Sequence, residues 1–347
     1  MPSQGLLTID CGAVVRNWRR LCGIHATGAV AGVVKANAYG LGVQRIAPAL
    51  LQAGCRHFFV ATPGEGDYLR KLLGEGPMIA VLNGYDPAMR PDLTPVINSL
   101  PQLRAAKGPV ILQVDTGMSR LGLDAEEVEA IARDPGLLAH VEILYVMTHL
   151  AAAEDAAHPV NAAQIDRFAE LCLKLPRARR CVANSSGIFL GGRYASDLAR
   201  PGCALYGINP TPGRPNPMEQ VVRLELPVLQ IRRIGAGETV GYGAGWLAAR
   251  PSRIATCAGG YADGLFRSLG SGMRGQFRGA TVPLAGRISM DVCSFDVTDV
   301  PDAVPGDMIE IIGPWQDPDA LAEIAGTIGY EVLTALGRRY RRRYIAA

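Results

Sequence analysis

Short apolar runs alternate with longer segments of helical periodicity between about residues 29 and 200. This alternation is typical of repeated βα units, which build a parallel sheet. The pattern predicts strands at residues 29–34, 58–61, 78–82, 94–97, 110–114, 143–147, 181–183 and 196–200. Eight such strands in succession indicate a (β/α)8 TIM-like barrel of the α/β class.

Two segments between these strands carry clear helix signals. Residues 125–133 follow Asp124, which suits an N-cap, and they place Glu126 and Glu127 in the first turn. Residues 164–175 repeat apolar side chains with a period of about 3.6 residues. Both segments are therefore predicted helices between barrel strands.

The pattern changes after residues 210–218, which are rich in proline and cannot continue a helix. Beyond them, short apolar runs punctuated by glycine and proline lie at residues 221–231, 253–257, 281–284, 293–297 and 308–312, with a late helix at 319–327. We therefore expect a barrel over residues 1–218 and a mainly-β C-terminal domain over residues 219–347.

Charge and composition narrow the possible functions. The net charge of +3 is spread along most of the chain, which argues against nucleic-acid binding. The exception is a tail that contains Arg338, Arg339, Arg341, Arg342 and Arg343. A run of this kind is commonly a solvated or dimer-facing surface, and binding to RNA or anionic lipid is the alternative.

Cysteine, histidine and hydropathy patterns point to a metal-free protein of the cytoplasm. The eight cysteines form no CxxC pair, so we expect reduced thiols. The five histidines show no metal-ligand spacing. The N-terminus lacks the features of a signal peptide, and no run of about eighteen apolar residues indicates a membrane segment.

Polar side chains follow several of the predicted barrel strands, where the active site of such a barrel lies. They are Lys35, Asp115, Arg120, His149, Asn184, Ser185 and Arg200. A lysine directly after a buried strand loses hydration, which lowers its pKa as an amine nucleophile requires. A strand-end lysine that reaches solvent is the alternative, and Lys35 alone does not separate the two.

The end of the seventh predicted strand suggests a phosphate site. Asn184 and Ser185 lead into a short helix at the position where this fold binds phosphate. A plain N-cap is the alternative role for the serine. Together with a strand-end lysine, a phosphate site fits a phosphorylated aldehyde held as a Schiff base.

The residues around Lys35 resemble a known signature. The run VVKANAYGLG, residues 33–42, is similar to the cofactor-lysine motif of the alanine racemases. The resemblance continues in the family's order through VDTGMSRLG, MTH, ANSSG, ARPGCALYGINP, VGYGAGW, GGYADG, GRISMD and GYEVLTALGRRY. It implies pyridoxal 5'-phosphate as cofactor and the interconversion of L- and D-alanine, either to supply D-alanine for peptidoglycan or to degrade alanine.

The resemblance also implies a homodimer in which each active site combines the barrel of one subunit with the β domain of the other. It assigns Lys35 and Tyr242 as catalytic bases on opposite faces of the substrate, because inversion needs a proton removed on one face and returned on the other. A tyrosine has a usual pKa near 10, so Tyr242 needs help from a cation or hydrogen-bond network, which His149 and Arg200 are expected to supply.

The family match implies further site residues. The cofactor-binding set comprises Lys35, Tyr39, His149, Asn184, Ser185, Arg200, Gly202 and Cys203. The substrate-binding set comprises Arg120, the backbone N–H of Met290, and Tyr261 at the entrance. Without the resemblance, Tyr242 would fit an ordinary turn aromatic and Met290 a core residue. The resemblance also implies that Arg200 faces the pyridine nitrogen of the cofactor, where many pyridoxal enzymes have a carboxylate.

Two positions depart from the family pattern. Gln113 stands where many relatives have a lysine that can be carbamylated, so Arg120 must be held by Gln113 itself or by a bound anion. Arg338 stands where some members have a tyrosine, which leaves the substrate range open. The alternatives are a broader racemase that accepts serine, a related barrel-type decarboxylase, and a non-catalytic cofactor carrier. Arg200 argues against the decarboxylase, and the β domain against the carrier.

Overall fold

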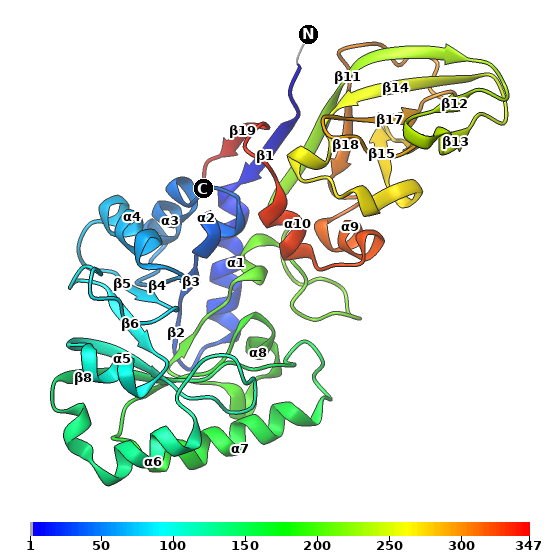
Figure 1. Ribbon diagram of the computed structural model, residues 1–347. Coiled ribbons are helices and arrows are strands. Elements are labelled where there is room, and N and C mark those ends of the chain that lie inside the picture. Colours follow the sequence, from blue (N-terminus) through cyan, green and yellow to red (C-terminus); the bar gives the residue numbers. More distant parts are fainter. Residues whose placement is uncertain (1–2) are drawn as a thin grey trace. The chain divides into compact units, whose positions relative to one another are not determined.

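The computed structural model describes residues 3–347, which form two compact units (Figure 1). One unit comprises Gly12–Glu219, and the other combines the segment up to Cys11 with Gln220–Ala347. The sequence pattern assigned the whole of residues 1–218 to the barrel, whereas the N-terminal segment lies in the β unit. The reason is strand pairing, since β1 (Leu6–Asp10) pairs with two strands from the C-terminal part of the chain.

The Gly12–Glu219 unit is a nearly closed barrel of parallel strands, which confirms the predicted fold class. Its strand order is β2-β10-β9-β8-β7-β6-β5-β4-β3. The first predicted strand is split into β2 (Ala29–Val30) and β3 (Gly32–Val33), and β10 (Leu198–Ala199) pairs with β2. The others are β4 (His57–Val60), β5 (Met78–Val81), β6 (Thr94–Ile97), β7 (Gly108–Gln113), β8 (Val141–Met147) and β9 (Arg179–Cys181).

Alternate residues of the barrel strands build two separate cores. Ile111 and Tyr145 belong to the cluster that fills the barrel interior. Their neighbours Leu112 and Val146 belong to a second cluster, which includes Phe168 from a covering helix. This period of two is what a strand covered on both faces requires.

The helices of this unit mostly follow the strands in the order that the pattern predicted. They are α1 (Cys11–Ile24), α2 (Lys35–Tyr39), α3 (Val43–Gln52), α4 (Pro63–Leu73), α5 (Leu100–Ala105), α6 (Ala125–Arg133), α7 (Pro159–Leu173) and α8 (Ser185–Leu190). Helix α6 has its predicted bounds, and Asp124 caps it. Helix α7 begins five residues earlier than predicted, because His158 caps it and Pro159 starts it.

The other unit is mainly β. Its strands are β1, β11 (Val222–Ile234), β12 (Thr239–Val240), β13 (Trp246–Leu247), β14 (Ser252–Ala258), β15 (Arg274–Phe277), β16 (Ala280–Pro283), β17 (Val292–Asp296), β18 (Met308–Ile312) and β19 (Arg341–Ile345). Helices α9 (Pro318–Ala325) and α10 (Gly329–Ala335) precede the last strand. The predicted late helix corresponds to α9.

The arginine-rich tail is part of this unit's sheet. Strand β19 pairs in parallel with β1, so the two ends of the chain share one sheet. Arg343 donates to Thr8 Oγ1 at 2.9 Å, and Arg342 donates to the Leu336 carbonyl at 3.3 Å. These contacts give the arginines a structural role within the chain. Within residues 3–347, no helix has the length and apolar character needed to cross a membrane.

Candidate active site

Lys35 follows β3 at the carboxyl end of the barrel strands. Burial lowers the pKa of its amine below the usual value, and the positive charges of Arg120 and Arg200 lower it further. The Glu65 carboxylate acts in the opposite direction. An amine in this setting loses its proton more readily than a solvated lysine, as a nucleophile or base requires.

Arg200 follows β10 and is buried beside the ends of two neighbouring strands. Its Nη1 donates to the Cys181 carbonyl at 3.0 Å and its Nη2 to the Thr148 carbonyl at 2.7 Å. Nη2 also donates to His149 Nδ1 at 3.3 Å. These bonds fix the plane of the guanidinium group at the top of the barrel.

His149 is neutral at ordinary pH. Burial lowers the pKa of its imidazole to about 3, and the nearby charges of Arg200, Arg120 and Lys35 contribute to this. A neutral ring that accepts a hydrogen bond at Nδ1 carries its proton on Nε2. The predicted residues Lys35, Arg120, His149 and Arg200 are therefore close enough to influence one another's protonation.

The loop that carries Arg120 is fixed from two sides. Asp115 Oδ1 accepts hydrogen bonds from the backbone N–H groups of residues 117–119, at 2.9 to 3.1 Å. Gln113 donates from Nε2 to the Leu121 carbonyl at 2.8 Å. Gln113 thus holds the loop through the backbone next to Arg120, whose own side chain is exposed.

A buried glutamine, which gave no clear sequence signal, ties this loop to the end of β8. Gln164 is fully buried in α7, and its Nε2 donates to Thr116 Oγ1 at 3.1 Å and to the His149 carbonyl at 2.9 Å. Its Oε1 accepts from Ala151 N–H at 2.8 Å. Thr116 and Thr148 share a further hydroxyl hydrogen bond of 2.7 Å. The sequence hinted at Gln164 only weakly, as a polar residue on the apolar face of the predicted helix at residues 164–175.

Hydroxyl groups and backbone N–H groups gather beside Gly202, as the phosphate hypothesis expects. Ser185 Oγ accepts from the N–H groups of Gly202 at 2.9 Å and Ala204 at 3.3 Å. A Cβ atom on Gly202 would lie 2.1 Å from Tyr39 Oη, so only glycine allows the hydroxyl to approach this backbone. Cys203 follows in the same turn.

Asn184, rather than Ser185, is the N-cap of α8. Its Oδ1 accepts from Gly187 N–H at 2.9 Å, and its Nδ2 donates to the Leu150 carbonyl at 3.3 Å. The Ser185 hydroxyl is turned toward Gly202 instead. A partly buried amine of lowered pKa, a fixed guanidinium group and this cluster of donors together fit a phosphorylated aldehyde cofactor.

The remaining predicted residues belong to the β unit and are exposed there. The exposed fractions are 71% for Tyr242, 43% for Tyr261 and 53% for Met290, so Met290 is not a core residue. Tyr261 N–H donates to the Ser289 carbonyl, and Ala262 N–H donates to the Met290 carbonyl, both at 3.0 Å. The structure thus brings Tyr261 and Met290 together.

Arg339 clamps the segments that carry Tyr261 and Met290. It donates to both carboxylate oxygens of Asp263, at 2.7 and 2.8 Å, and to Asp291 at 2.7 Å. These two carboxylates raise the pKa of Arg339 above its usual value. The sequence placed Arg339 in a surface tail, because the partners of the tail come from distant loops.

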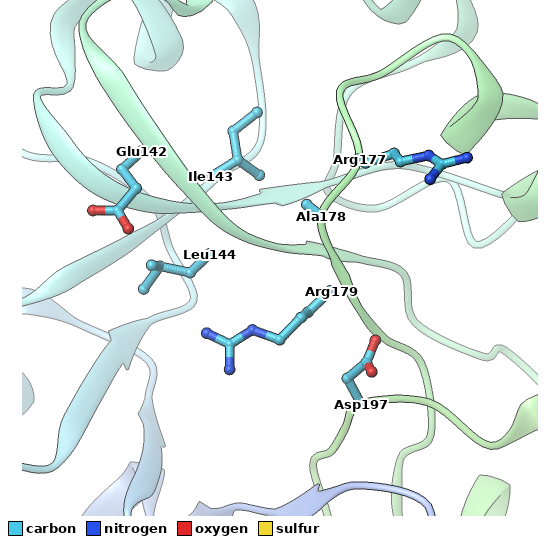
Figure 2. A pocket seen from close by; sticks show the side chains of 7 residues that line it. All are labelled: Glu142, Ile143, Leu144, Arg177, Ala178, Arg179 and Asp197. Atoms are coloured by element: carbon cyan, nitrogen blue, oxygen red, sulfur yellow. The ribbon is translucent and has the colours of Figure 1, made fainter.

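A hollow lies at the amino ends of β8 and β9, whereas Lys35 follows the carboxyl end of β3. Figure 2 shows the side chains that line the hollow. It is lined by Glu142, Ile143, Leu144, Arg177, Ala178, Arg179 and Asp197. The Arg179 guanidinium lies 4.6 Å from the centre of the Tyr145 ring. In this fold, residues at the amino ends of the strands serve stability rather than catalysis.

Comparison with known proteins agrees with the two units. The alanine racemase N-terminal domain matches residues 9–210, and the alanine racemase C-terminal domain matches residues 221–344. An alanine racemase of Acidiphilium cryptum is 55% identical over 97% of each chain. A catabolic alanine racemase of Mesorhizobium japonicum is 48% identical over 98% of this chain and 93% of the relative.

Solved structures show the same relationship. Alanine racemase of Bartonella henselae, with covalently bound pyridoxal phosphate, superposes with a TM-score of 0.94 at 43% identity, covering 99% of this chain and all of that one. The biosynthetic alanine racemase of Pseudomonas aeruginosa gives a TM-score of 0.92 at 32% identity, with 99% and 100% coverage. The chain therefore belongs to the alanine racemase family.

Proposed function

We propose that this protein interconverts L-alanine and D-alanine, with pyridoxal 5'-phosphate held at Lys35. The observation that carries the proposal is the partly buried Lys35 amine, whose pKa is lowered, at the strand ends beside the fixed Arg200 guanidinium. The alanine racemases that match the chain over nearly its full length support the same reaction. When bound, the cofactor stabilises the negative charge left on the substrate Cα after the α-proton departs.

Two bases on opposite faces of the substrate move the α-proton. Lys35 Nζ acts on one face, where its lowered pKa favours the neutral amine, the form that can accept a proton. The phenolic oxygen of Tyr242 acts on the other face. Tyr242 is 71% exposed in its own subunit, which leaves it available to the barrel of a second copy.

Arg200 would hold the pyridine nitrogen of the cofactor. A guanidinium group keeps its proton at every relevant pH, so it donates a hydrogen bond without protonating the ring. His149 accepts from Arg200 and keeps the guanidinium in place. With Arg200 at the pyridine nitrogen, the ring would draw negative charge less strongly than a protonated ring, which would disfavour side reactions such as transamination.

The phosphate would be held by Tyr39, Ser185, Gly202 and Cys203, whose hydroxyl and N–H groups lie together. Asn184 shapes this site by capping α8.

The substrate carboxylate would bind Arg120, whose planar fork suits a carboxylate, and the backbone N–H of Met290. Tyr261 would line the entrance, next to Met290.

The proposed assembly is a homodimer with shared active sites, in the cytoplasm. The half-exposed Met290 and the exposed Tyr242 support the proposal, because both side chains are accessible to a second subunit. The cysteines form no disulfide among the described residues, as a reducing compartment requires.

Borohydride reduction followed by peptide mass spectrometry tests the proposal. We expect the pyridoxyl group on Lys35 alone, and racemisation of alanine faster than that of serine. A pyridoxyl group on another lysine, or a loaded protein that does not racemise alanine, would refute it. Lys35→Ala serves as the control, since it should bind no cofactor covalently.

A further inference from the structure

The turn that carries Lys35 has a backbone conformation that its residues rarely adopt. Ala36, Asn37, Ala38 and Tyr39 have φ angles of 52°, 56°, 54° and 53°. In this left-handed region, the Cβ atom of an L-residue comes too close to the following carbonyl oxygen. Such a turn persists only where surrounding contacts fix it.

Glu65 contacts this turn from the next βα unit. It is the third residue of α4, and its Oε1 accepts from Ala36 N–H at 2.6 Å. Its Oε2 accepts from Ala61 N–H at 2.8 Å and Thr62 N–H at 3.4 Å, directly after β4. One carboxylate therefore joins the turn after the first barrel strand to the end of the second.

Other contacts hold the more distant part of the turn. Asn37 Oδ1 accepts from Val43 N–H at 3.0 Å, and the ring of Tyr39 packs on that of Tyr206 with centroids 4.6 Å apart. The hydrogen bond from Ala36 to Glu65 is made by the residue directly after the lysine. Glu65 is thus the side chain placed to fix the point where the lysine leaves the turn.

Glu65 also differs in the sign of its charge from the other charged groups that act on Lys35. Arg120, in the loop after β7, and Arg200, after β10, place positive charge near Lys35, and burial adds to their effect. His149, after β8, is neutral. Glu65 is the group whose charge raises the pKa of Lys35 against these influences.

We propose that Glu65 is a positioning residue for Lys35: its carboxylate fixes the left-handed turn at the N–H group of Ala36, and its negative charge acts on the amine through space. The inference rests on the proposed role of Lys35 as the cofactor lysine. A plain helix-capping role is the alternative, because Glu65 and Thr62 also form the capping box of α4.

Three full-length variants separate these roles. Glu65→Ala removes the charge and both acceptors, and Glu65→Gln removes the charge but keeps one acceptor oxygen. Thr62→Val is the matched control, because it removes the Thr62 Oγ1 that accepts from Glu65 N–H at 3.3 Å and leaves the carboxylate in place. Cofactor loading is measured first for each variant.

Two readouts besides activity then test the proposal. The first is hydrogen exchange of the amides of residues 36–42 in the loaded enzyme. The second is the pH midpoint for acetylation of Lys35 by acetic anhydride, after hydroxylamine has removed the cofactor. We expect Glu65→Ala to speed exchange at Ala36 about tenfold, as loss of a charged hydrogen bond does. Both Glu65 variants should shift the midpoint to lower pH, and Thr62→Val should match the wild type in both readouts.

A midpoint in both Glu65 variants equal to that of Thr62→Val would overturn the proposal, even if exchange became faster. Failure of the proposed function looks different. In that case the wild-type protein itself would carry no cofactor on Lys35, whereas failure of the positioning role alone would leave wild-type loading intact. If Glu65→Ala does not fold, the acetylation midpoints of Glu65→Gln and Thr62→Val still test the positioning role. Equal midpoints in these two variants would overturn it.

Discussion

Arg200 and His149 form a hydrogen-bonded pair in which the guanidinium group stays charged and the imidazole stays neutral. The lowered pKa of His149 results from burial first and from the nearby cations second. Lys35 could be singled out in the sequence because it directly follows a buried strand. The neutral state of His149 could not be predicted from the sequence. It depends first on burial in the folded barrel and then on cations such as Arg200, which lies 51 positions further along the chain.

The pKa of His149 predicts how stability depends on pH at this residue. An unfolded histidine takes up a proton below its usual pKa of about 6.5, whereas the folded one resists protonation down to about 3. The free energy of unfolding should therefore fall as the pH drops from about 6.5 toward about 3. Urea unfolding of the cofactor-free protein across this range measures the slope.

His149→Gln isolates this contribution, because every other titrating group is shared with the wild type. We expect a shallower loss of stability on acidification in the variant. Identical slopes for the two proteins would mean that His149 is not held neutral in the folded state.

Two elements carry the groups proposed to bind the substrate, and each is braced by residues from elsewhere in its unit. The Arg120 loop is held by Asp115, Gln113 and the buried Gln164. The segments of Tyr261 and Met290 are joined by backbone hydrogen bonds and by the Arg339 clamp. Rigid support of this kind keeps binding groups in a productive geometry.

Arg339→Gln should loosen the substrate side of the site without affecting cofactor loading. The clamp ties Asp263 to Asp291, which flank the segments of Tyr261 and Met290. Steady-state kinetics should show KM for alanine raised several-fold, because a loosened backbone N–H binds the carboxylate less well. The cofactor absorbance should remain that of the wild type.

Arg341→Gln is the control, since Arg341 lies in the same tail but outside the clamp. It should leave KM unchanged. An equal effect of the two substitutions would point to loss of tail charge rather than to the clamp.

At the scale of the whole molecule, local patterns predicted the barrel but not the elements that depend on distant pairing. Most barrel strands are short apolar runs, and α6 carries its own capping box, so both could be found in the sequence. The exception is β9 (Arg179–Cys181), which begins with two arginines and starts two residues before the predicted strand. Strands β1 and β19 pair across almost the full length of the chain, so no local signal places them in the β unit. The left-handed turn at residues 36–39 was equally hidden, because its non-glycine residues do not favour it.

The site residues also fall into two groups, those that a sequence motif identifies and those that only the fold reveals. Motif resemblance supplied Lys35 and Tyr242, while the bracing residues Glu65, Gln164 and Arg339 emerged only from contacts between segments far apart in sequence. Such residues have no motif of their own. Their roles depend on which backbone groups the fold brings within reach.

The most direct test of the central claim is recovery of activity from a mixture of two inactive variants. Lys35→Ala and Tyr242→Phe should each abolish racemisation, since each removes one of the two bases. If every active site takes Lys35 from one subunit and Tyr242 from the other, a mixed dimer contains one intact site. Random exchange of subunits should then restore about a quarter of the wild-type rate per subunit.

The measurement is alanine racemisation after the two variants have been mixed and allowed to exchange, with mixed dimers verified by native mass spectrometry. We predict that activity appears in the mixture and is absent from each variant alone. Mixed dimers that form but remain inactive would contradict a shared site with Lys35 and Tyr242 as its two bases.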